Sequence, residues 1–365
     1  MAAAAGVDAF LPQASLSAPC KRPPGEDPGI DRHCQQGRQP GYEIVDSLAF
    51  ERLLRHDGAA EREYRPRHGE LKTVGHWGQR KLMLAEVEFL TRFHGDASTV
   101  VYAGAAPGLH VPLMAELFPR LRFVLVDPRP MAGMVSTCRA FEEGRIEIRT
   151  GLFTAEMAKE FAGLSPLFIS DVRTSDDTRE PSEAEVKADM ELQMVWHNIM
   201  RPKASSFKFR LPWSAGKTVY LDGDIYLPVW GPVTTTESRL FVLGGATTTT
   251  YDNSMYERQM FYFNTHQRIA RYKHEYMDFY KCSCYDCTAE GRILADYIQK
   301  VKNRDAQEPQ AGSSVALEEL SLRLNRACHR DHQHPRTLFD PNPDPEERKR
   351  KIRKRQAMKP GGTPA

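Results

Sequence analysis

The stretch VVYAGAAPG, residues 100–108, decides the fold that the sequence predicts. An apolar run typical of a buried strand leads directly into a turn with two glycines, and residues 109–118 follow with the composition of a short helix. A strand, a glycine turn and a helix in this order open a nucleotide-binding α/β unit. Gly104 and Gly108 allow the backbone to turn tightly and to approach a ligand that a Cβ atom would push away.

A second apolar run, residues 123–126, ends on Asp127. A carboxylate at the end of this strand is able to accept hydrogen bonds from both ribose hydroxyls of an adenosine ligand. The glycine spacing differs from the G-x-G-x-x-G of dinucleotide enzymes, and the stretch lacks the Gly-Lys-Ser/Thr that cradles phosphates. An adenosine cofactor without a pyrophosphate fits best, and S-adenosylmethionine is the commonest of these. A tight turn between strand and helix without any ligand is the alternative.

The rest of the pattern predicts strands that alternate with helices. A helix is expected over residues 78–93, where apolar residues recur every three or four positions, and another over 182–200, which opens with a capping box. Two aromatic-rich helices are expected at 256–269 and 273–280. The further expected strands are 122–127, 145–149, 167–171, 206–211, 218–227 and 238–243. This order predicts an α/β, Rossmann-like fold with a seven-stranded, mostly parallel sheet, an antiparallel strand at one edge, and helices on both faces.

The composition bounds the organisation of the chain. Its 365 residues, 41% of them hydrophobic, suffice for one large domain with additional segments. We expect a disordered arm over residues 1–40, a methyltransferase-like domain over 41–275, a helical and cysteine-containing extension over 276–335, and a disordered basic tail over 336–365. No run of 18 apolar residues occurs, so no membrane span is expected.

The seven cysteines follow no disulfide framework, which favours a reducing compartment. Cys282, Cys284 and Cys287 form a C-x-C-x-x-C pattern that Cys328 or nearby histidines would complete to four zinc ligands. The spacing is not that of a standard zinc knuckle, so free thiols are expected and no metal is assigned.

The tail carries a dense basic run at residues 348–355, interrupted only by Ile352. Such runs serve as nuclear localisation signals or as phosphate-binding arms, and a solvated extension without a dedicated partner is the alternative. A nuclear location is therefore the expectation, with the cytoplasm as the alternative for a viral protein.

Four ionisable residues are expected to converge at the carboxyl ends of the strands, where doubly wound sheets bind their ligands. Asp171 ends the fourth predicted strand, Lys208 lies on the fifth, Glu237 precedes the last, and Lys81 lies in the helix before the first. Each alone is more often a solvated surface group, and the prediction rests on all four occurring together.

This set of side chains suits methyl transfer to a ribose 2′-hydroxyl, a weak acid that needs a base. A lysine is a base only when neutral, and its ordinary pKa is about 10.4. We expect burial, the ammonium of Lys81 and the positive sulfur of the cofactor to lower the pKa of Lys208. Asp171 and Glu237 would then orient the two amines.

A more specific signal comes from five stretches that occur in a fixed order: residues 78–82, 100–108, 169–173, 180–182 and 204–210. Together they resemble the poxvirus family of cap-specific mRNA nucleoside-2′-O-methyltransferases, with its relatives in large DNA viruses and kinetoplastids. The resemblance covers roughly residues 60–270. It implies that Lys81, Asp171, Lys208 and Glu237 form the family's Lys-Asp-Lys-Glu tetrad. The contacts that it implies for S-adenosylmethionine are Gln79, Tyr102, Gly104, Gly108, Asp127, Arg129 and Phe153.

The same family stacks a cationic 7-methylguanine between two aromatic rings and binds its edge with carboxylates. The resemblance implies that Trp213 and Tyr64 are the two rings, that Glu257 is a carboxylate, and that Arg210 is among the residues that bind the RNA. Ala215 replaces a second acid of the family, so the cap contacts are expected to differ in detail. Ordinary core packing is the alternative for both rings.

The activity implied by the resemblance is methyl transfer from S-adenosylmethionine to the ribose 2′-hydroxyl of a nucleotide adjacent to the m7G cap of mRNA, with Lys208 as general base. Capped mRNA is then the partner, together with other RNA-processing proteins and no membrane. Because the poxvirus relative also stimulates a poly(A) polymerase, a cap-binding or polyadenylation-stimulating RNA-binding subunit without essential catalysis is the alternative. A methyltransferase for bases or small molecules is a third reading.

Overall fold

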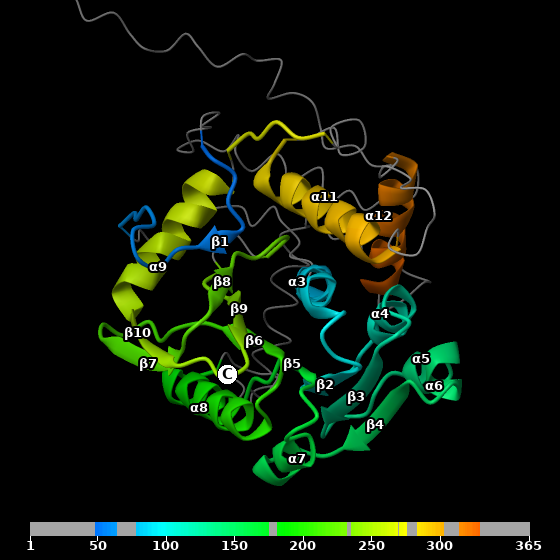
Figure 1. Cartoon of the computed structure of the whole chain (residues 1–365). Coiled ribbons are helices and arrows are strands. Elements are labelled where there is room, and N and C mark those ends of the chain that lie inside the picture. Colours follow the sequence, from blue (N-terminus) through cyan, green and yellow to red (C-terminus); the bar gives the residue numbers. More distant parts are fainter. Residues whose placement is uncertain are drawn as a thin grey trace, which may run out of the picture.

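An eight-stranded sheet forms the centre of the protein in the computed structural model, which describes residues 48–63, 78–174, 181–231, 235–268, 270–275, 283–302 and 314–328 (Figure 1). The strand order is β1-β8-β9-β6-β5-β2-β3-β4. The strands are β1 (Leu53–Leu54), β2 (Thr99–Ala103), β3 (Arg122–Asp127), β4 (Ile146–Thr150), β5 (Leu167–Ser170), β6 (Ala204–Phe209), β8 (Asp224–Tyr226) and β9 (Ser238–Leu243).

Every pair of adjacent strands among β2 to β6 is parallel, whereas β9 runs antiparallel to both β6 and β8. This confirms the predicted mostly parallel sheet. The antiparallel strand β9 lies between β8 and β6 and not at the edge where it was predicted, and the two-residue β1 adds an eighth strand to the predicted seven. All of β5 and residues 100–103 of β2 are buried, as expected for central strands covered on both faces.

Helices cover both faces of the sheet, with α3 and α4 on one side and α7 and α8 on the other (Figure 1). The predicted helix 78–93 is α3, and the predicted capping box at Ser182 is present at the start of α8. The helices are α3 (Gly78–Phe93), α4 (Val111–Leu117), α5 (Gly133–Ser136), α6 (Arg139–Glu142), α7 (Ala155–Glu160), α8 (Glu183–Met200), α9 (Asn253–Tyr262), α11 (Tyr285–Tyr297) and α12 (Ser314–Cys328), with π-helical turns η2 (Phe263–Gln267) and η3 (Ile298–Lys302).

The predicted single strand 218–227 is wrong. It divides into β7 (Lys217–Leu221), which pairs with β10 (Thr248–Asp252) in a separate two-stranded sheet, and β8 of the main sheet. The turn between them passes so close to β9 that a Cβ atom on Gly223 would lie 2.4 Å from the carbonyl oxygen of Phe241. The glycine therefore lets the chain change sheets at a point where any side chain would clash.

Helices α11 and α12 of the expected extension pack against α3 (Figure 1). The predicted helix 256–269 corresponds to α9 and η2, which begin earlier, at Asn253. Residues 273–275 are not helical, and the rest of the predicted helix 273–280 lies outside the described residues, as do the arm 1–40 and the tail 336–365. Among the described residues, no helix is both long and apolar enough to cross a membrane.

A buried histidine between α8 and β6 makes the stability of the fold pH-dependent. His197 Nδ1 lies 2.8 Å from Ser205 Oγ, and burial lowers the pKa of His197 to about 4 from an ordinary 6.5. Between these two values the unfolded chain binds more protons than the folded one, so stability falls as the pH falls from 6.5 to 4.

We expect this histidine to account for a loss of about 3 kcal/mol of unfolding free energy across that window. Denaturant unfolding at pH 7 and pH 4 should show a smaller acid-dependent loss in His197→Gln than in the unchanged protein. Equal losses of unfolding free energy in the two proteins would show that His197 is not the cause of the acid dependence.

Candidate active site

The glycine turn after β2 packs directly on the chain that leaves β5. Gly104 has a φ of +79°, and a Cβ atom placed on it would lie 2.9 Å from the backbone nitrogen of Val172. The backbone N–H of Asp171 donates to the carbonyl oxygen of Ala103 at 3.0 Å. Asp171 is therefore fixed beside the glycine turn by backbone contacts that only a glycine at position 104 permits.

Gly104→Ala is expected to lower the unfolding free energy by about 2–4 kcal/mol, because it adds a backbone clash to the strain of a positive φ. Gly163→Ala is the matched control, since Gly163 has a φ of +81° with nothing within 4 Å of the new Cβ atom. Chemical denaturation measures both changes. Equal losses would show that the contact with Val172 has no energetic weight.

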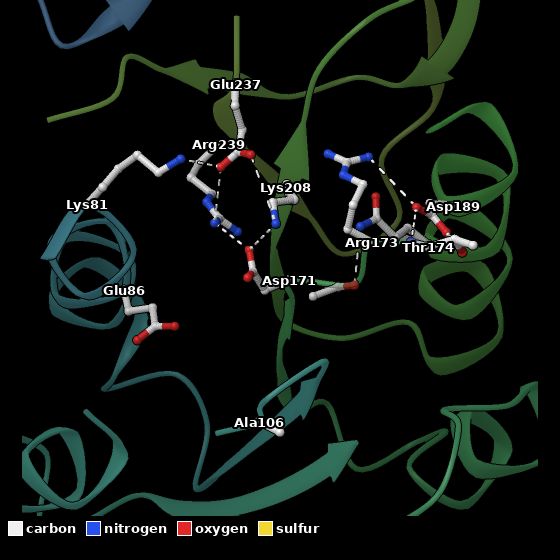
Figure 2. A network of polar contacts seen from close by, with 12 residues as sticks. Lys81, Glu86, Ala106, Asp171, Arg173, Thr174, Asp189, Lys208, Glu237 and Arg239 are labelled. Atoms are coloured by element: carbon white, nitrogen blue, oxygen red, sulfur yellow. Dashed lines mark hydrogen bonds and ion pairs between the residues drawn. The ribbon is translucent and has the colours of Figure 1, made fainter. Parts of the chain in front are cut away.

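The four residues predicted to converge do so at this edge of the sheet (Figure 2). Lys81 Nζ lies 2.5 Å from Glu237 Oε1, and Lys208 Nζ lies 3.3 Å from Asp171 Oδ1 and 4.0 Å from Glu237 Oε2. Figure 2 shows the two lysines approaching Glu237 from different elements, with Asp171 between Lys208 and the glycine turn that contains Ala106. The two amines thus share one carboxylate.

Arg239 is a fifth member of this cluster and was not predicted from the sequence. Its Nη2 atom lies 2.5 Å from Asp171 Oδ1 and 3.8 Å from Glu237 Oε1, and the residue is almost fully buried. Lys208 and Arg239 are directly opposite each other on β6 and β9, so their side chains leave the same face of the sheet. The position of Arg239 at the start of a predicted strand, two residues after Glu237, was a usable signal.

The cluster holds three cationic side chains, Lys81, Lys208 and Arg239, against the two carboxylates of Asp171 and Glu237, which leaves one surplus positive charge when all are ionised. Burial, with help from Arg239 and Lys208, lowers the pKa of Lys81 against the opposing effect of Glu237. Burial alone would raise the pKa of Glu237 and of Asp171, but the neighbouring cations lower both, that of Glu237 well below its ordinary value. Both acids are therefore carboxylates at neutral pH.

The loop that follows Asp171 is fixed by a buried acid of α8 that was also not predicted from the sequence. Asp189 accepts hydrogen bonds from the backbone N–H of Thr174 at 2.8 Å and from its hydroxyl at 2.7 Å (Figure 2). A single acid in a helix carries no sequence signal for such a long-range contact.

Asp127 lies at the end of β3, as predicted, and its carboxylate is 2% exposed. It accepts hydrogen bonds from the backbone N–H of Ala106 in the glycine turn at 3.0 Å and from the backbone N–H of Arg129 at 2.9 Å. The Arg129 guanidinium also donates to it, although that side chain is 66% exposed. Asp127 thus links the turn after β2 to the turn after β3.

Three other residues proposed from the resemblance occupy different settings. Gln79 lies partly exposed in the first turn of α3. Tyr102 is buried and donates its hydroxyl hydrogen to Glu86 Oε1 at 2.5 Å, so its side chain faces the protein interior. Phe153 is packed in the core against the rings of Phe168 and Trp196, and packing accounts for this side chain.

Two of the residues proposed for the cap, Arg210 and Trp213, directly follow β6. Trp213 is a large aromatic residue that is 45% exposed, and the Arg210 guanidinium carbon lies 4.0 Å from its ring centroid. The next residue, Ser214, accepts a hydrogen bond from the Asn253 side chain at the start of α9, the helix that carries Glu257. Partial burial raises the pKa of Glu257. Tyr64 lies outside the described residues.

Within the described part of the chain, no group of three or more His, Cys, Asp or Glu side chains is arranged to hold a metal ion. Cys284 and Cys287 are buried. Cys328 is a free cysteine, and burial raises the pKa of its thiol to about 12, which keeps the thiol protonated. Cys282 lies outside the described residues.

The strand order, with a glycine turn after β2 and an acid at the end of β3, defines this protein as an α/β protein with a Rossmann-like methyltransferase fold. More particularly, it belongs to the family described as the poly A polymerase regulatory subunit, whose family model matches residues 50–304.

Relatives in poxviruses carry a named activity. The chain is 29% identical over 230 residues to a myxoma virus (strain Lausanne) protein named cap-specific mRNA (nucleoside-2′-O-)-methyltransferase. That match covers 56% of this chain and 66% of the relative, just under two thirds of its length. A fowlpox virus (strain NVSL) protein of the same name is 27% identical over 212 residues, which is 52% of this chain and 67% of that protein.

Among solved structures, bluetongue virus VP4, described as a multifunctional RNA-capping production line, aligns with a TM-score of 0.39 and 14% identity. The alignment covers 65% of this chain and 40% of VP4, and a similarity this weak supports no inference.

Proposed function

We propose that the protein transfers a methyl group from S-adenosylmethionine to the ribose 2′-hydroxyl of a nucleotide adjacent to the m7G cap of mRNA. The observation that carries the proposal is the meeting of Lys81, Lys208, Asp171 and Glu237 beside the glycine turn. The names of the poxvirus relatives support the same activity.

The residues around the glycine turn fit an adenosine cofactor that lacks a pyrophosphate. Asp127 offers a buried carboxylate at the strand end. The side-chain donor to this carboxylate is the exposed Arg129 guanidinium, which the hydroxyls of a ribose would replace. Gly104 and Gly108 leave the backbone bare at two positions of the turn. S-adenosylmethionine would supply an electrophilic methyl group on a positively charged sulfur.

Lys208 is the residue that accepts the proton of the 2′-hydroxyl. Its amine contacts Asp171, whose backbone packs on the glycine turn, whereas Lys81 lies on the far side of Glu237. Lys208 must be neutral to accept a proton. When Lys208 is neutral, two cationic side chains face the two carboxylates, and the cluster has no surplus positive charge. Asp171, which is itself paired with Arg239, holds the amine in place, and Glu237 lies between this amine and that of Lys81.

The proposal is tested by incubating the protein with S-adenosylmethionine that carries a labelled methyl group and with capped or uncapped RNA of one sequence. Label is expected on the capped RNA only. Capped RNAs that already carry a 2′-O-methyl group at successive riboses would show which nucleotide is the acceptor. Equal labelling of capped and uncapped RNA would contradict a cap-dependent activity.

Trp213→Ala is expected to weaken binding of a cap analogue by about 1–3 kcal/mol, because a half-exposed ring would stack on the cationic guanine. Competition between the cap analogue and capped RNA measures this change. Trp213→Phe is the matched control, since it retains a ring and most of the stacking. Unchanged affinity in Trp213→Ala would remove Trp213 from the cap site.

A second candidate is a cap-binding or polyadenylation-stimulating subunit without essential catalysis, which the description of the family favours. The two functions differ in their dependence on the amines. Stimulation of a poly(A) polymerase that persists in a Lys208→Ala variant without methyl transfer would show two separate functions on one chain. Stimulation without methyl transfer in the unchanged protein would favour the second candidate alone.

The basic run at residues 348–355 supports a nuclear location, although it lies outside the described residues. Imaging of a fluorescent fusion with and without this run tests that proposal. Nuclear accumulation that does not depend on the run would contradict it.

A further inference from the structure

One buried carboxylate of α11 collects hydrogen bonds from three other parts of the chain. Glu290 is fully buried and accepts from the Arg80 guanidinium of α3 at 2.6 and 2.9 Å. It also accepts from the indole N–H of Trp230 at 2.6 Å and from the hydroxyl of Ser321 of α12 at 2.7 Å. A carboxylate with donors on both oxygens is fixed in place, and so are the elements that donate to it.

A second buried carboxylate lies one helical turn earlier and holds the same loop. Asp286 accepts from the backbone N–H of Trp230 at 2.7 Å and from Arg268 Nε at 3.0 Å, and the Arg268 guanidinium also donates to the carbonyl oxygen of Gly231. Trp230 has a φ of +58°, a conformation that a large side chain rarely adopts. Strain of this kind persists only where the surrounding structure determines the conformation. Here the surrounding contacts come from the carboxylates of α11.

These contacts reach the candidate active site through Lys81. Arg80, which binds Glu290, directly precedes Lys81 in α3. On the other side, a Cβ atom placed on Gly231 would lie 3.5 Å from Lys81 Cδ, so the aliphatic part of Lys81 lies against the loop that Asp286 and Glu290 hold. The residue that precedes this lysine and the loop against its aliphatic part are therefore both bonded to α11.

We infer that Asp286 and Glu290 are positioning residues for Lys81, and that α11 is thereby part of the active-site structure although its residues touch no reacting group. The kinetic consequence rests on the proposed function, whereas the placement of the Lys81 amine does not. A purely structural role would stabilise the fold without changing the environment of this amine.

The test uses the full chain with Glu290→Gln, with Trp230→Phe, which removes one donor to Glu290 and keeps a ring, and with Asp296→Asn as control. Asp296 lies on the same helix in an exposed ion pair with Lys300. Thermal unfolding first establishes that each variant is folded. If Glu290→Gln does not fold, the Trp230→Phe variant decides the test.

The activity-independent readout is the pKa of Lys81, measured by NMR titration of isotope-labelled lysine and assigned with Lys81→Arg. The charged groups that face this amine are Glu237, Arg239 and Lys208, and burial is the main cause of its lowered pKa. Loosening the contacts of Arg80 and of the loop at residues 230–231 admits water, so both variants should raise the pKa of Lys81 by about half a unit or more. The control should leave it unchanged. An unchanged or lower value in both variants overturns the inference.

The kinetic readout separates the inference from the proposed function. With methyl transfer established, both variants should lower kcat about tenfold or more while the KM for S-adenosylmethionine changes less than about twofold. Equal changes in kcat and KM would indicate general loss of structure and overturn the positioning role. Absence of methyl transfer in the unchanged protein would refute the proposed function, and the Lys81 titration would still decide the placement of the amine.

Discussion

Lys208→Ala is expected to lower kcat for methyl transfer to capped RNA by about 10²–10⁴-fold, the range that a general base contributes. The reason is that the amine beside Asp171 is the group placed to accept the 2′-hydroxyl proton. Transfer of a labelled methyl group under saturating cofactor and RNA measures kcat directly. Cap affinity should remain close to that of the unchanged protein, because Trp213 and α9 are not altered.

The matched control is Lys203→Ala, which removes an exposed lysine just before the same strand. Activity should remain within about twofold, as expected for a surface substitution away from the site. Retention of most activity in Lys208→Ala would show that this lysine is not the base.

Arg80→Ala is expected to lower the unfolding free energy by about 3–5 kcal/mol, because it leaves the carboxylate of Glu290 buried without its ionic partner. Both side chains of this ion pair are fully buried, and the closest of its N···O distances is 2.6 Å. Denaturant unfolding followed by circular dichroism measures the change. Adding Glu290→Gln to Arg80→Ala should recover part of the loss, since it removes the uncompensated charge.

Arg92→Ala is the control on the same helix. Arg92 pairs with Asp224 at 2.9 Å, but both side chains are nearly half exposed, so its loss should lower the unfolding free energy by about 1 kcal/mol or less. A loss in Arg80→Ala no larger than that in Arg92→Ala would contradict the importance of the buried pair for joining α3 to α11.

The sequence was sufficient for the parts of the fold that depend on local pattern. Apolar runs that end in glycine or an acid predicted β2, β3 and β5, and the spacing of apolar residues predicted α3. The division of 218–227 between two sheets was missed because it depends on the close approach of Gly223 to β9, a contact between residues far apart in the sequence. The Asp222-Gly223 pair, a common turn sequence, was the available local signal.

The residues of the candidate site also divide into those that the sequence pattern predicts and those that it does not. Lys81, Asp171, Lys208 and Glu237 were predictable together, because each lies at a strand end or in the helix before the first strand. Arg239 was accessible from its two-residue spacing after Glu237.

The buried acids of α8 and α11 were not predictable. Asp189, Asp286 and Glu290 look like ordinary helical acids until packing shows which loops donate to them. A carboxylate that is buried and paired over a long sequence distance has the same local pattern as a solvated one.

The chemical identity of the methylated product is the most direct test of the proposed methyl transfer to a ribose 2′-hydroxyl. The unchanged protein is incubated with capped RNA and S-adenosylmethionine that carries a deuterated methyl group, and the RNA is digested to nucleotides and analysed by mass spectrometry. The heavy methyl group is expected on the ribose 2′-oxygen of a nucleotide next to the cap, and Lys208→Ala is expected to form this product at least about 10²-fold more slowly. A heavy methyl group on a base, or no transfer to RNA by the folded protein, would contradict the proposal.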